Sequence, residues 1–278
     1  KNKCKIYYVL VDHNIRKNSS NEAKSVKKLL KKHKIKLNIL KNTKTIKKNI
    51  QSEARIIRYD LLTNFCKKKK IKTILTAHNL EDQVETFFMR LSRGSGLKGL
   101  SAMKPLTKIT GNISLYRPLL EVKKKILVKI SKNIFGTYVK DPSNKNEKYL
   151  RTKIRNLKRP LEKSGIKYEQ IFRSIQNLSL SKSTLEGYFE KIFKDLIRKK
   201  NREIHINFNN YKGLNKEIKI ALINESVKQL RNNYYDLRSI KVINLINVID
   251  RKNFKKSTLG GCVFFKKGEN LCLKVEKI

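Results

Sequence analysis

Acidic residues are scarce in this chain of 278 residues. Its 22 aspartates and glutamates stand against 67 lysines and arginines, which gives a formal net charge of +45. This balance excludes an acidic, freely soluble domain without a polyanionic partner. Arginine accounts for only 15 of the cations, so part of the excess is expected to be a solvated, lysine-rich surface. The remainder makes a phosphate backbone the expected partner, because each neutralised phosphate releases counterions.

Long apolar runs are also missing. The longest clean run covers residues 6–11, far below the roughly 18 residues of a membrane helix. Neither end of the chain supplies a basic helix with a strong apolar face, so we expect no membrane partner. The start of the chain shows no signal-peptide pattern, which favours a cytoplasmic protein.

Paired cysteines are absent as well. The four cysteines, Cys4, Cys66, Cys262 and Cys272, form no Cys-x-x-Cys motif. A zinc or iron–sulfur site built on local cysteine pairs is therefore not expected, and we predict no bound metal among the site residues. The same cysteines are compatible with a reducing cytoplasm.

What the chain does contain is enough apolar material for a core, with 39% hydrophobic and 8% aromatic residues. In its first half, short apolar runs alternate with segments of helical periodicity. The expected strands cover residues 5–11, 37–40 and 73–77. The expected helices cover residues 21–34, 52–66, with Ser52 as N-cap, and 81–91. This alternation predicts an α/β fold with a doubly wound parallel sheet and right-handed crossovers.

The second half has a different pattern. We expect a loop-rich stretch at 94–111, helices at 122–135 and 149–161, and a turn at 141–144. Beyond residue 165 helices with Asn-rich connections follow, and residues 262–275 read as a β-hairpin. The chain is therefore predicted to divide into residues 1–165, an α/β domain, and residues 166–278, a helical segment with a small α+β domain.

Several residues point to a site at the carboxyl ends of the predicted strands, where ligands bind in such sheets. His13 and His78 each follow a strand. Asp82 and Glu85 lie three residues apart and therefore share a helix face. Acidic residues in a first helical turn are also favoured by the helix dipole, which is the structural alternative.

Two basic motifs accompany these residues. Arg93 and Gly94 end the 81–91 helix, where they form either a C-cap or a contact to phosphate. Arg151 and Arg155 are four residues apart, so they share a helix face along which a nucleic-acid backbone can lie. A solvated basic helix is the alternative.

The motifs occur in a family-specific order. They are DHNIR (12–16), EARIIRY (53–59), AHNLEDQVETFFMRLSRGSGLKGLSAM (77–103), YRPLL (116–120) and DPSN (141–144). In this order they resemble bacterial tRNA(Ile)-lysidine synthetase, a family of PP-loop ATP-pyrophosphatases. The resemblance spans residues 9–160, and the segment 77–103 is its most specific part. Residues 237–275 also resemble the small C-terminal domain of that family, so residues 166–278 are expected to contain a small tRNA-contacting domain.

The resemblance implies an activity. ATP, with Mg²⁺, adenylates the wobble cytidine of tRNA(Ile) with a CAU anticodon, and free L-lysine then displaces AMP to give lysidine. Asp82 is expected to act as the base that holds the lysine amine. Glu85 and Arg58 are expected to orient lysine and the activated cytidine, with His78 at the rim. The remaining expected contacts are His13, Arg16, Arg93 and Gly94 to ATP, and Arg151, Lys153 and Arg155 to tRNA.

One departure from the family pattern is large. The family begins with a strand that ends in a Ser-Gly-Gly-x-Asp-Ser loop, and this chain contains no such loop. We expect an N-terminally truncated synthetase, which can be inactive as this fragment alone. Glu81, where the family commonly has Asp, is a minor departure. Two alternatives stay open: a tRNA thiolase of the same superfamily and a catalytically dead RNA-binding fragment. A homodimer is also open.

Overall fold

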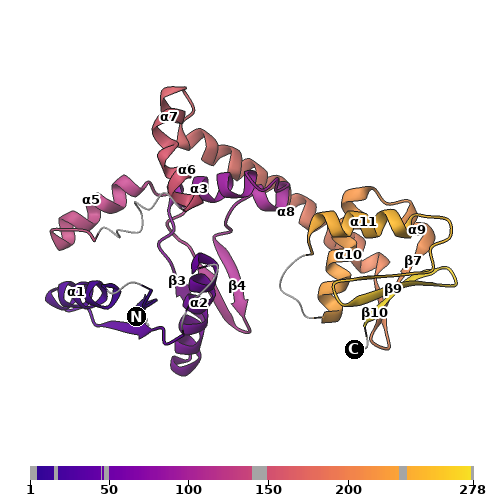
Figure 1. Cartoon of the computed structure of the whole chain (residues 1–278), viewed down its shortest axis with the longest axis horizontal. Coiled ribbons are helices and arrows are strands. Elements are labelled where there is room, and N and C mark those ends of the chain that lie inside the picture. Colours follow the sequence, from indigo (N-terminus) through magenta and orange to yellow (C-terminus); the bar gives the residue numbers. More distant parts are fainter. Residues whose placement is uncertain are drawn as a thin grey trace. The chain divides into compact units, whose positions relative to one another are not determined.

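The computed structural model describes residues 5–15, 18–44, 46, 50–139, 149–231 and 237–276. The chain divides into two compact units, Lys1–Ser179 and Leu180–Ile278. The colours of Figure 1 follow the chain from one unit into the other. The domain boundary predicted at residue 165 remains a prediction about where the first domain ends.

The first unit opens with strands and helices in alternation, as the sequence predicts. The elements are β1 (Tyr8–Asp12), α1 (Ser19–Lys32), β2 (Leu37–Lys41), α2 (Ile50–Lys69), β3 (Thr73–Leu75) and α3 (Leu80–Leu91). Ser52 is not the N-cap of α2, because the helix already includes Ile50. Nothing in Ile50 or Gln51 opposes helical geometry, so the first turn forms ahead of the serine.

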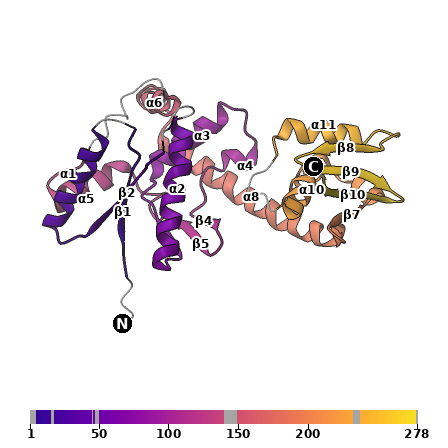
Figure 2. The ribbon, with the colours of Figure 1, turned by 60° about the horizontal axis from the view of Figure 1, so that its bottom comes forward.

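The strands of the first unit form two small sheets. Strand β1 pairs in parallel with β2, and β3 pairs in parallel with β5 (Ile113–Tyr116), which also pairs antiparallel with β4 (Leu106–Thr110). In Figure 2, β1 and β2 lie on one side of α2, and β4 and β5 lie on the other. The fold is therefore α/β, but its sheets are small and fragmented where the sequence predicts one continuous doubly wound sheet.

Helices make up the rest of this unit. They are α4 (Leu97–Leu100), α5 (Lys124–Phe135), α6 (Leu150–Asn156), α7 (Lys158–Lys163) and the start of α8 (Tyr168–Leu196). The single helix predicted over 149–161 is wrong. It is interrupted at Leu157, because Pro160 has no N–H to donate and its ring would clash with the carbonyl of Asn156. The predicted turn at 141–144 lies outside the described residues.

The position of α3 is fixed by apolar packing against α8. Leu80 and Val84 of α3 are buried against Tyr168, Phe172 and Ile175 of α8. Val84 is fully buried. The acidic end of α3 is therefore held firmly on the rest of the unit.

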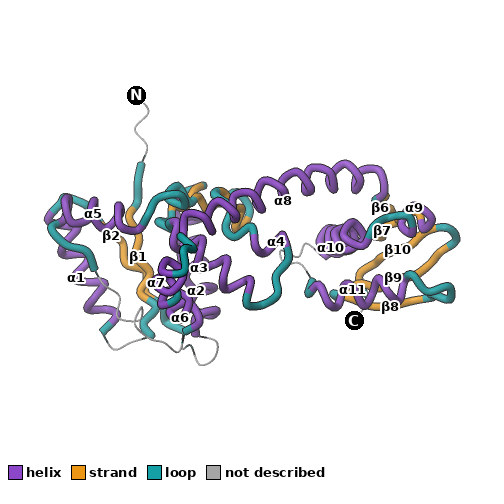
Figure 3. Tube along the Cα trace, turned by 90° about the horizontal axis from the view of Figure 1, so that it is seen from above, coloured by secondary structure: helices purple, strands orange, loops and turns teal. Residues whose placement is uncertain are grey.

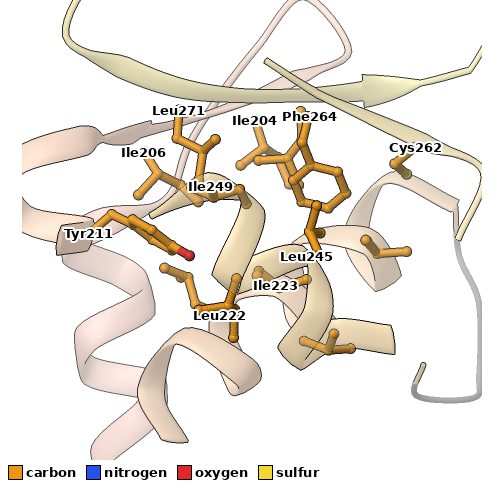
Figure 4. Close-up of a cluster of buried hydrophobic side chains, with 14 of the residues drawn as sticks. Ile204, Ile206, Tyr211, Leu222, Ile223, Leu245, Ile249, Cys262, Phe264 and Leu271 are labelled. Atoms are coloured by element: carbon orange, nitrogen blue, oxygen red, sulfur yellow. The ribbon is translucent and has the colours of Figure 1, made fainter. Parts of the chain in front are cut away.

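The second unit is an antiparallel sheet packed on helices. After the end of α8 come β6 (Arg198–Lys200), β7 (Glu203–Asn207), α9 (Phe208–Lys212), α10 (Lys216–Arg231), α11 (Ser239–Ile249), β8 (Lys256–Leu259), β9 (Cys262–Lys267) and β10 (Asn270–Val275). The strand order is β6-β7-β10-β9-β8. Strands β9 and β10 confirm the predicted hairpin. Figure 4 shows side chains such as Ile204, Phe264 and Leu271 meeting Leu222 and Ile249 of the helices.

Figure 3 shows the helices of the chain in purple, the long α8 among them. In the part of the chain that the structure describes, none of these helices combines the length and the apolar character that a membrane span requires.

Candidate functional site

A large cavity of about 2180 Å³ opens in the first unit. It borders the end of β1, at Asp12 and His13, and the residues that follow β3, at Thr76 and His78. The sequence predicts a site at these strand ends. Six of the predicted site residues line the cavity: His13, Arg58, His78, Arg93, Arg151 and Arg155.

His13 is held by Arg58. Nε and Nη2 of Arg58 lie 3.2 and 3.1 Å from Nε2 of His13. A guanidinium only donates hydrogen bonds, so His13 Nε2 accepts and the imidazole carries its proton on Nδ1. Burial lowers the pKa of His13, and Arg58 lowers it further against the opposing charge of Asp12. His13 is therefore neutral at pH 7, and its buried Nδ1 has no partner among the described residues.

His78 is neutral for similar reasons. Its Nδ1 lies 2.9 Å from Oγ1 of Thr76. Burial is the largest cause that lowers the pKa of His78, to about 4, and the charges of Arg117, Arg55 and Arg151 act in the same direction against Asp82. Because the His78 imidazole is uncharged, it can donate or accept a hydrogen bond at the cavity wall, but it adds no positive charge that would attract phosphate.

Asp82 caps its own helix. The backbone N–H of Asn79 donates to Asp82 Oδ2, and the backbone N–H of Asp82 donates to Asn79 Oδ1, both at 3.1 Å. This reciprocal capping box is the structural alternative that the sequence left open, and it is present. Asp82 does not line the cavity, but its side chain is 19% exposed and Oδ1 lies 3.9 Å from Arg155. One carboxylate oxygen therefore remains approachable.

Glu85 is engaged more completely. It is only 3% exposed, and its Oε2 lies 3.0 Å from Nη2 of Arg155 and 3.0 Å from Nε of Arg151. Its Oε1 accepts from Nε of Arg155. Burial raises the pKa of Glu85, and the two arginines oppose that rise. The predicted shared face of Arg151 and Arg155 exists, and it joins α6 to α3 through this buried carboxylate.

Besides Asp82 and Glu85, three predicted residues lie apart from the cavity or outside the described residues. Lys153 is exposed on the far side of α6 from Arg151 and Arg155. Gly94 has a φ of +65° just after α3, and its N–H donates to the carbonyl of Leu91, which is the expected geometry of a helix C-terminus. Arg16 lies outside the described residues.

Two arginines outside the predicted site residues also gather around the cavity. Arg55 and Arg90 line it. Arg90 also donates to the carbonyls of Gly99 and Ala102 at 2.6 and 2.8 Å, which ties down the loop after α3. Burial is the first cause that lowers the pKa of Arg58, and the charges of Arg55 and Arg151 contribute. The sequence did contain a signal for this cluster. Arginine is scarce in the chain, and most arginines of the first unit line the cavity.

Metal-ligating groups do not cluster in the described residues. No three His, Cys, Asp or Glu side chains within them are placed to hold a metal ion. Cys66, Cys262 and Cys272 are buried free thiols, and Cys66 lies in a different unit from the other two. The described part of the chain therefore offers no cysteine cluster for an iron–sulfur centre.

Comparisons with known proteins agree with this picture. The family model of the PP-loop domain matches residues 1–161. The chain is 33% identical over 267 residues to the tRNA(Ile)-lysidine synthase of Wolbachia sp. subsp. Brugia malayi, which covers 95% of this chain and 62% of the relative. It is also 33% identical over 278 residues to that of Wolbachia pipientis wMel, covering 98% and 64%. The chain thus spans less than two thirds of the length of these relatives.

One solved structure has a similar fold. The U34-tRNA thiolase NcsA from Methanococcus maripaludis, with its [4Fe-4S] cluster, matches with a TM-score of 0.50 at 18% sequence identity, over 62% of this chain and 60% of that one. At this identity the likeness concerns the fold alone. The family match covers more than half of the sequence and contains the whole arginine-lined cavity. The chain therefore belongs to the PP-loop domain family and is similar along most of its length to the tRNA(Ile)-lysidine synthases.

Proposed function

We propose that this chain is part of a tRNA(Ile)-lysidine synthase, which uses ATP to join free L-lysine to carbon 2 of the wobble cytidine in tRNA(Ile) with a CAU anticodon. The observation that carries this proposal is the cavity at the ends of β1 and β3, lined by Arg55, Arg58 and Arg93. Its guanidinium groups can bind the phosphates of either a nucleoside triphosphate or an RNA backbone.

The cavity fits ATP better than a protein-bound metal ion. A PP-loop domain implies ATP, and the guanidinium groups of Arg58 and Arg93 in the cavity lining can pair with its phosphates. Asp12 is buried at the end of β1, where Ser20 Oγ and the N–H of Asn14 donate to its carboxylate. We infer that Mg²⁺, which assists adenylation, is held mainly by the phosphates, with Asp12 as the nearby carboxylate.

The roles of Asp82 and Glu85 separate in this proposal. The attacking amine must lose a proton, so a carboxylate has to stand beside it. Both oxygens of Glu85 are engaged by Arg151 and Arg155. In Asp82, by contrast, the cation that approaches Oδ1 is the guanidinium of Arg155, 3.9 Å away. Asp82 is therefore the proposed base. Glu85 positions α6, and Arg58 and His78 orient the cytidine from the cavity wall.

The two sheets of the first unit are proposed to be parts of one doubly wound sheet. All residues of Tyr8–Asp12 and of Thr73–Leu75 line the cavity. A strand face presents alternate residues, so lining by consecutive residues means that the cavity borders the strand edges. Helix α2 packs against both β1 and β3. An α-helix is about 10–12 Å wide, and neighbouring strands of a sheet lie about 4.8 Å apart. A helix that packs on both β1 and β3 therefore leaves room for one further strand between these two strands.

The experiment uses the protein encoded by the complete gene. It is incubated with ATP, Mg²⁺, lysine and a tRNA(Ile) transcript that carries CAU, and the nucleosides are analysed by mass spectrometry. The expected product is lysidine at the wobble position, with release of AMP and diphosphate. A transcript with a GAU anticodon is the control and stays unmodified.

Two other outcomes would each replace this proposal. In a parallel reaction that contains sulfide in place of lysine, incorporation of sulfur would indicate a thiolase, which the solved structure with a similar fold makes worth testing. Binding of tRNA without any modification would indicate an RNA-binding protein without catalysis. A cytoplasmic location and a homodimer remain predictions.

A further inference from the structure

Helix α3 holds the loop that follows it through two long polar side chains. Gln83 is only 5% exposed, and its amide binds the backbone of one residue twice. Its Nε2 donates to the carbonyl of Met103 at 2.9 Å, and its Oε1 accepts from the N–H of Met103 at 2.8 Å. Nη1 of Arg90 donates to the carbonyls of Gly99 and Ala102. The loop from Gly99 to Met103 is therefore fixed to α3 at both of its ends.

This loop needs such support because part of its backbone is in an unfavourable conformation. Ala102 is buried and has a φ of +51°, in the left-handed region that residues other than glycine seldom adopt. Met103 follows directly and lines the cavity, whereas Gln83 does not. Gln83 can therefore act on a ligand in the cavity only through the position that it gives to Met103.

The face of α3 beside Met103 also lines the cavity, with Thr86, Met89 and Arg93. Successive residues of a helix are about 100° apart, so Met89 lies about 120° around the helix from Gln83, and Thr86 and Arg93 lie between them. Gln83 holds Met103 at one edge of this arc. Met103 and Met89 therefore stand on the two sides of a strip that carries Thr86 and Arg93.

The two sides of this strip are chemically alike. The chain has only two methionines, Met89 and Met103, and both line the cavity. A methionine side chain is flexible and polarizable, and its sulfur makes favourable contacts with aromatic rings. The two side chains therefore suit a flat heteroaromatic ring placed between them.

Thr86 limits which ring fits. Its Oγ1 donates to the carbonyl of Asp82 at 2.7 Å, so the hydroxyl proton is used and the oxygen can only accept from a ligand. The exocyclic amino group of adenine or cytosine can donate to this oxygen. The oxo group at the corresponding position of guanine or uracil has no proton to donate. Arg93 on the same strip can pair with a phosphate of the nucleotide.

We propose that Gln83 is a positioning residue, whose amide holds Met103 at the cavity wall so that Met103 and Met89 enclose an amino-bearing nucleobase beside Thr86. Two such bases take part in the proposed reaction, the adenine of ATP and the wobble cytosine, so this inference rests on the proposed function. The competing explanation is that Gln83 only stabilises the loop.

The test measures how much of the binding comes from the base. With the protein encoded by the complete gene, the Kd of ATP is compared with that of inorganic triphosphate, which has no base. The Kd of the tRNA(Ile) transcript is compared with that of a transcript whose wobble nucleotide is abasic. The variants are Gln83→Leu, which loses both bonds to Met103, and Met103→Ala. Val84→Ala is the matched control, because Val84 is the next residue of α3 but is buried against α8.

Both variants should reduce the contribution of the base about 2- to 10-fold, the range of a contact between sulfur and an aromatic ring. If the base is adenine, ATP binds more weakly and triphosphate binds as before. If it is the wobble cytosine, the preference for the intact transcript shrinks and ATP binds as before. Val84→Ala should lower stability without either change. The double variant Gln83→Leu with Met103→Ala should bind like Met103→Ala, because Gln83 acts through Met103.

Thr86 gives a second readout that leaves the bonds of Gln83 intact. Thr86→Val should weaken binding of the amino-bearing ligand about 2- to 10-fold, the effect of one hydrogen bond, and Thr86→Ser should bind like the original. GTP, or a transcript with uridine at the wobble position, should bind to Thr86→Val as it does to the original. Unchanged binding of the amino-bearing ligand in Thr86→Val would remove the selection for an amino group.

The proposal is overturned if the base contribution survives in Gln83→Leu and Met103→Ala, or if it falls equally in Val84→Ala. Either result would leave Gln83 with a purely structural role. Binding is measured without turnover, so the two proposals fail separately. The expected shifts in a protein that forms no lysidine would refute the proposed function and leave this inference standing.

Discussion

Arg155 of α6 holds the carboxylate of Glu85 on α3 through two nitrogens. Its Nη2 lies 3.0 Å from Oε2, and its Nε donates to Oε1. The two residues are 70 positions apart in the sequence. This pairing joins two helices beside the cavity, and it turns Arg155 toward the protein rather than toward solvent.

Breaking this pair should destabilise the fold. Glu85→Gln leaves two guanidinium groups without their buried partner, so the free energy of unfolding should fall by about 3 kcal/mol. Urea denaturation measures the change, and Lys153→Ala, on the exposed side of α6, should stay within about 0.5 kcal/mol. If Glu85→Gln keeps its stability but loses activity, Glu85 would instead have the role of orienting lysine.

The RNA contact predicted on α6 needs a test that does not depend on Glu85. Lys153→Ala should reduce the slope of the salt dependence of tRNA binding by about one unit, because Lys153 is exposed. The double variant Arg151→Ala with Arg155→Ala removes two cations that Glu85 already engages, so it should lower stability, and its effect on the slope tests whether these arginines also contact phosphate. If Lys153→Ala leaves the slope unchanged, Lys153 makes no phosphate contact and belongs to the solvated basic surface.

Asp82→Asn should abolish lysidine formation and leave tRNA binding nearly intact. The asparagine loses the basic carboxylate, yet its amide oxygen can still accept from the N–H of Asn79, so the cap is kept. Asp82→Ala loses the cap as well and should cost about 1 kcal/mol more in stability. The measurements are lysidine by mass spectrometry and tRNA binding by filter retention. Equal losses of binding and activity in Asp82→Asn would contradict the assignment.

His78 should make the fold sensitive to acid. Its pKa is about 4 in the folded protein and 6.5 in the reference state, so the unfolded chain binds more protons between these values. Stability should therefore be unaffected above pH 6.5 and fall as the pH drops toward 4. Between pH 7 and pH 5 the loss is about 1–2 kcal/mol, which His78→Gln should remove. The contribution of His13 has the same sign and is common to both proteins. An identical pH dependence in both would show that His78 titrates normally.

The sequence by itself determined the local structure. Short apolar runs and helical periodicity predict β1 to α3 nearly in place, and Asn79 and Asp82 form a cap because their spacing of three residues brings each side chain to the other's backbone. The turn between β9 and β10 is equally local. The interruption at Leu157 was also readable, since Pro160 forbids a continuous helix there.

The tertiary structure alone decided which charges meet. Burial of Leu80 and Val84 under α8 fixes α3, and this places Glu85 against Arg151 and Arg155 instead of against the cavity. The C-terminal sheet likewise depends on a register that aligns Phe265 with Cys272, and Cys272 with His205 of β7, a strand distant in the sequence. Spacing along a chain specifies neighbours within a turn or a hairpin. Contacts between distant segments follow from the packing of apolar surfaces, which orients the polar groups that those segments carry.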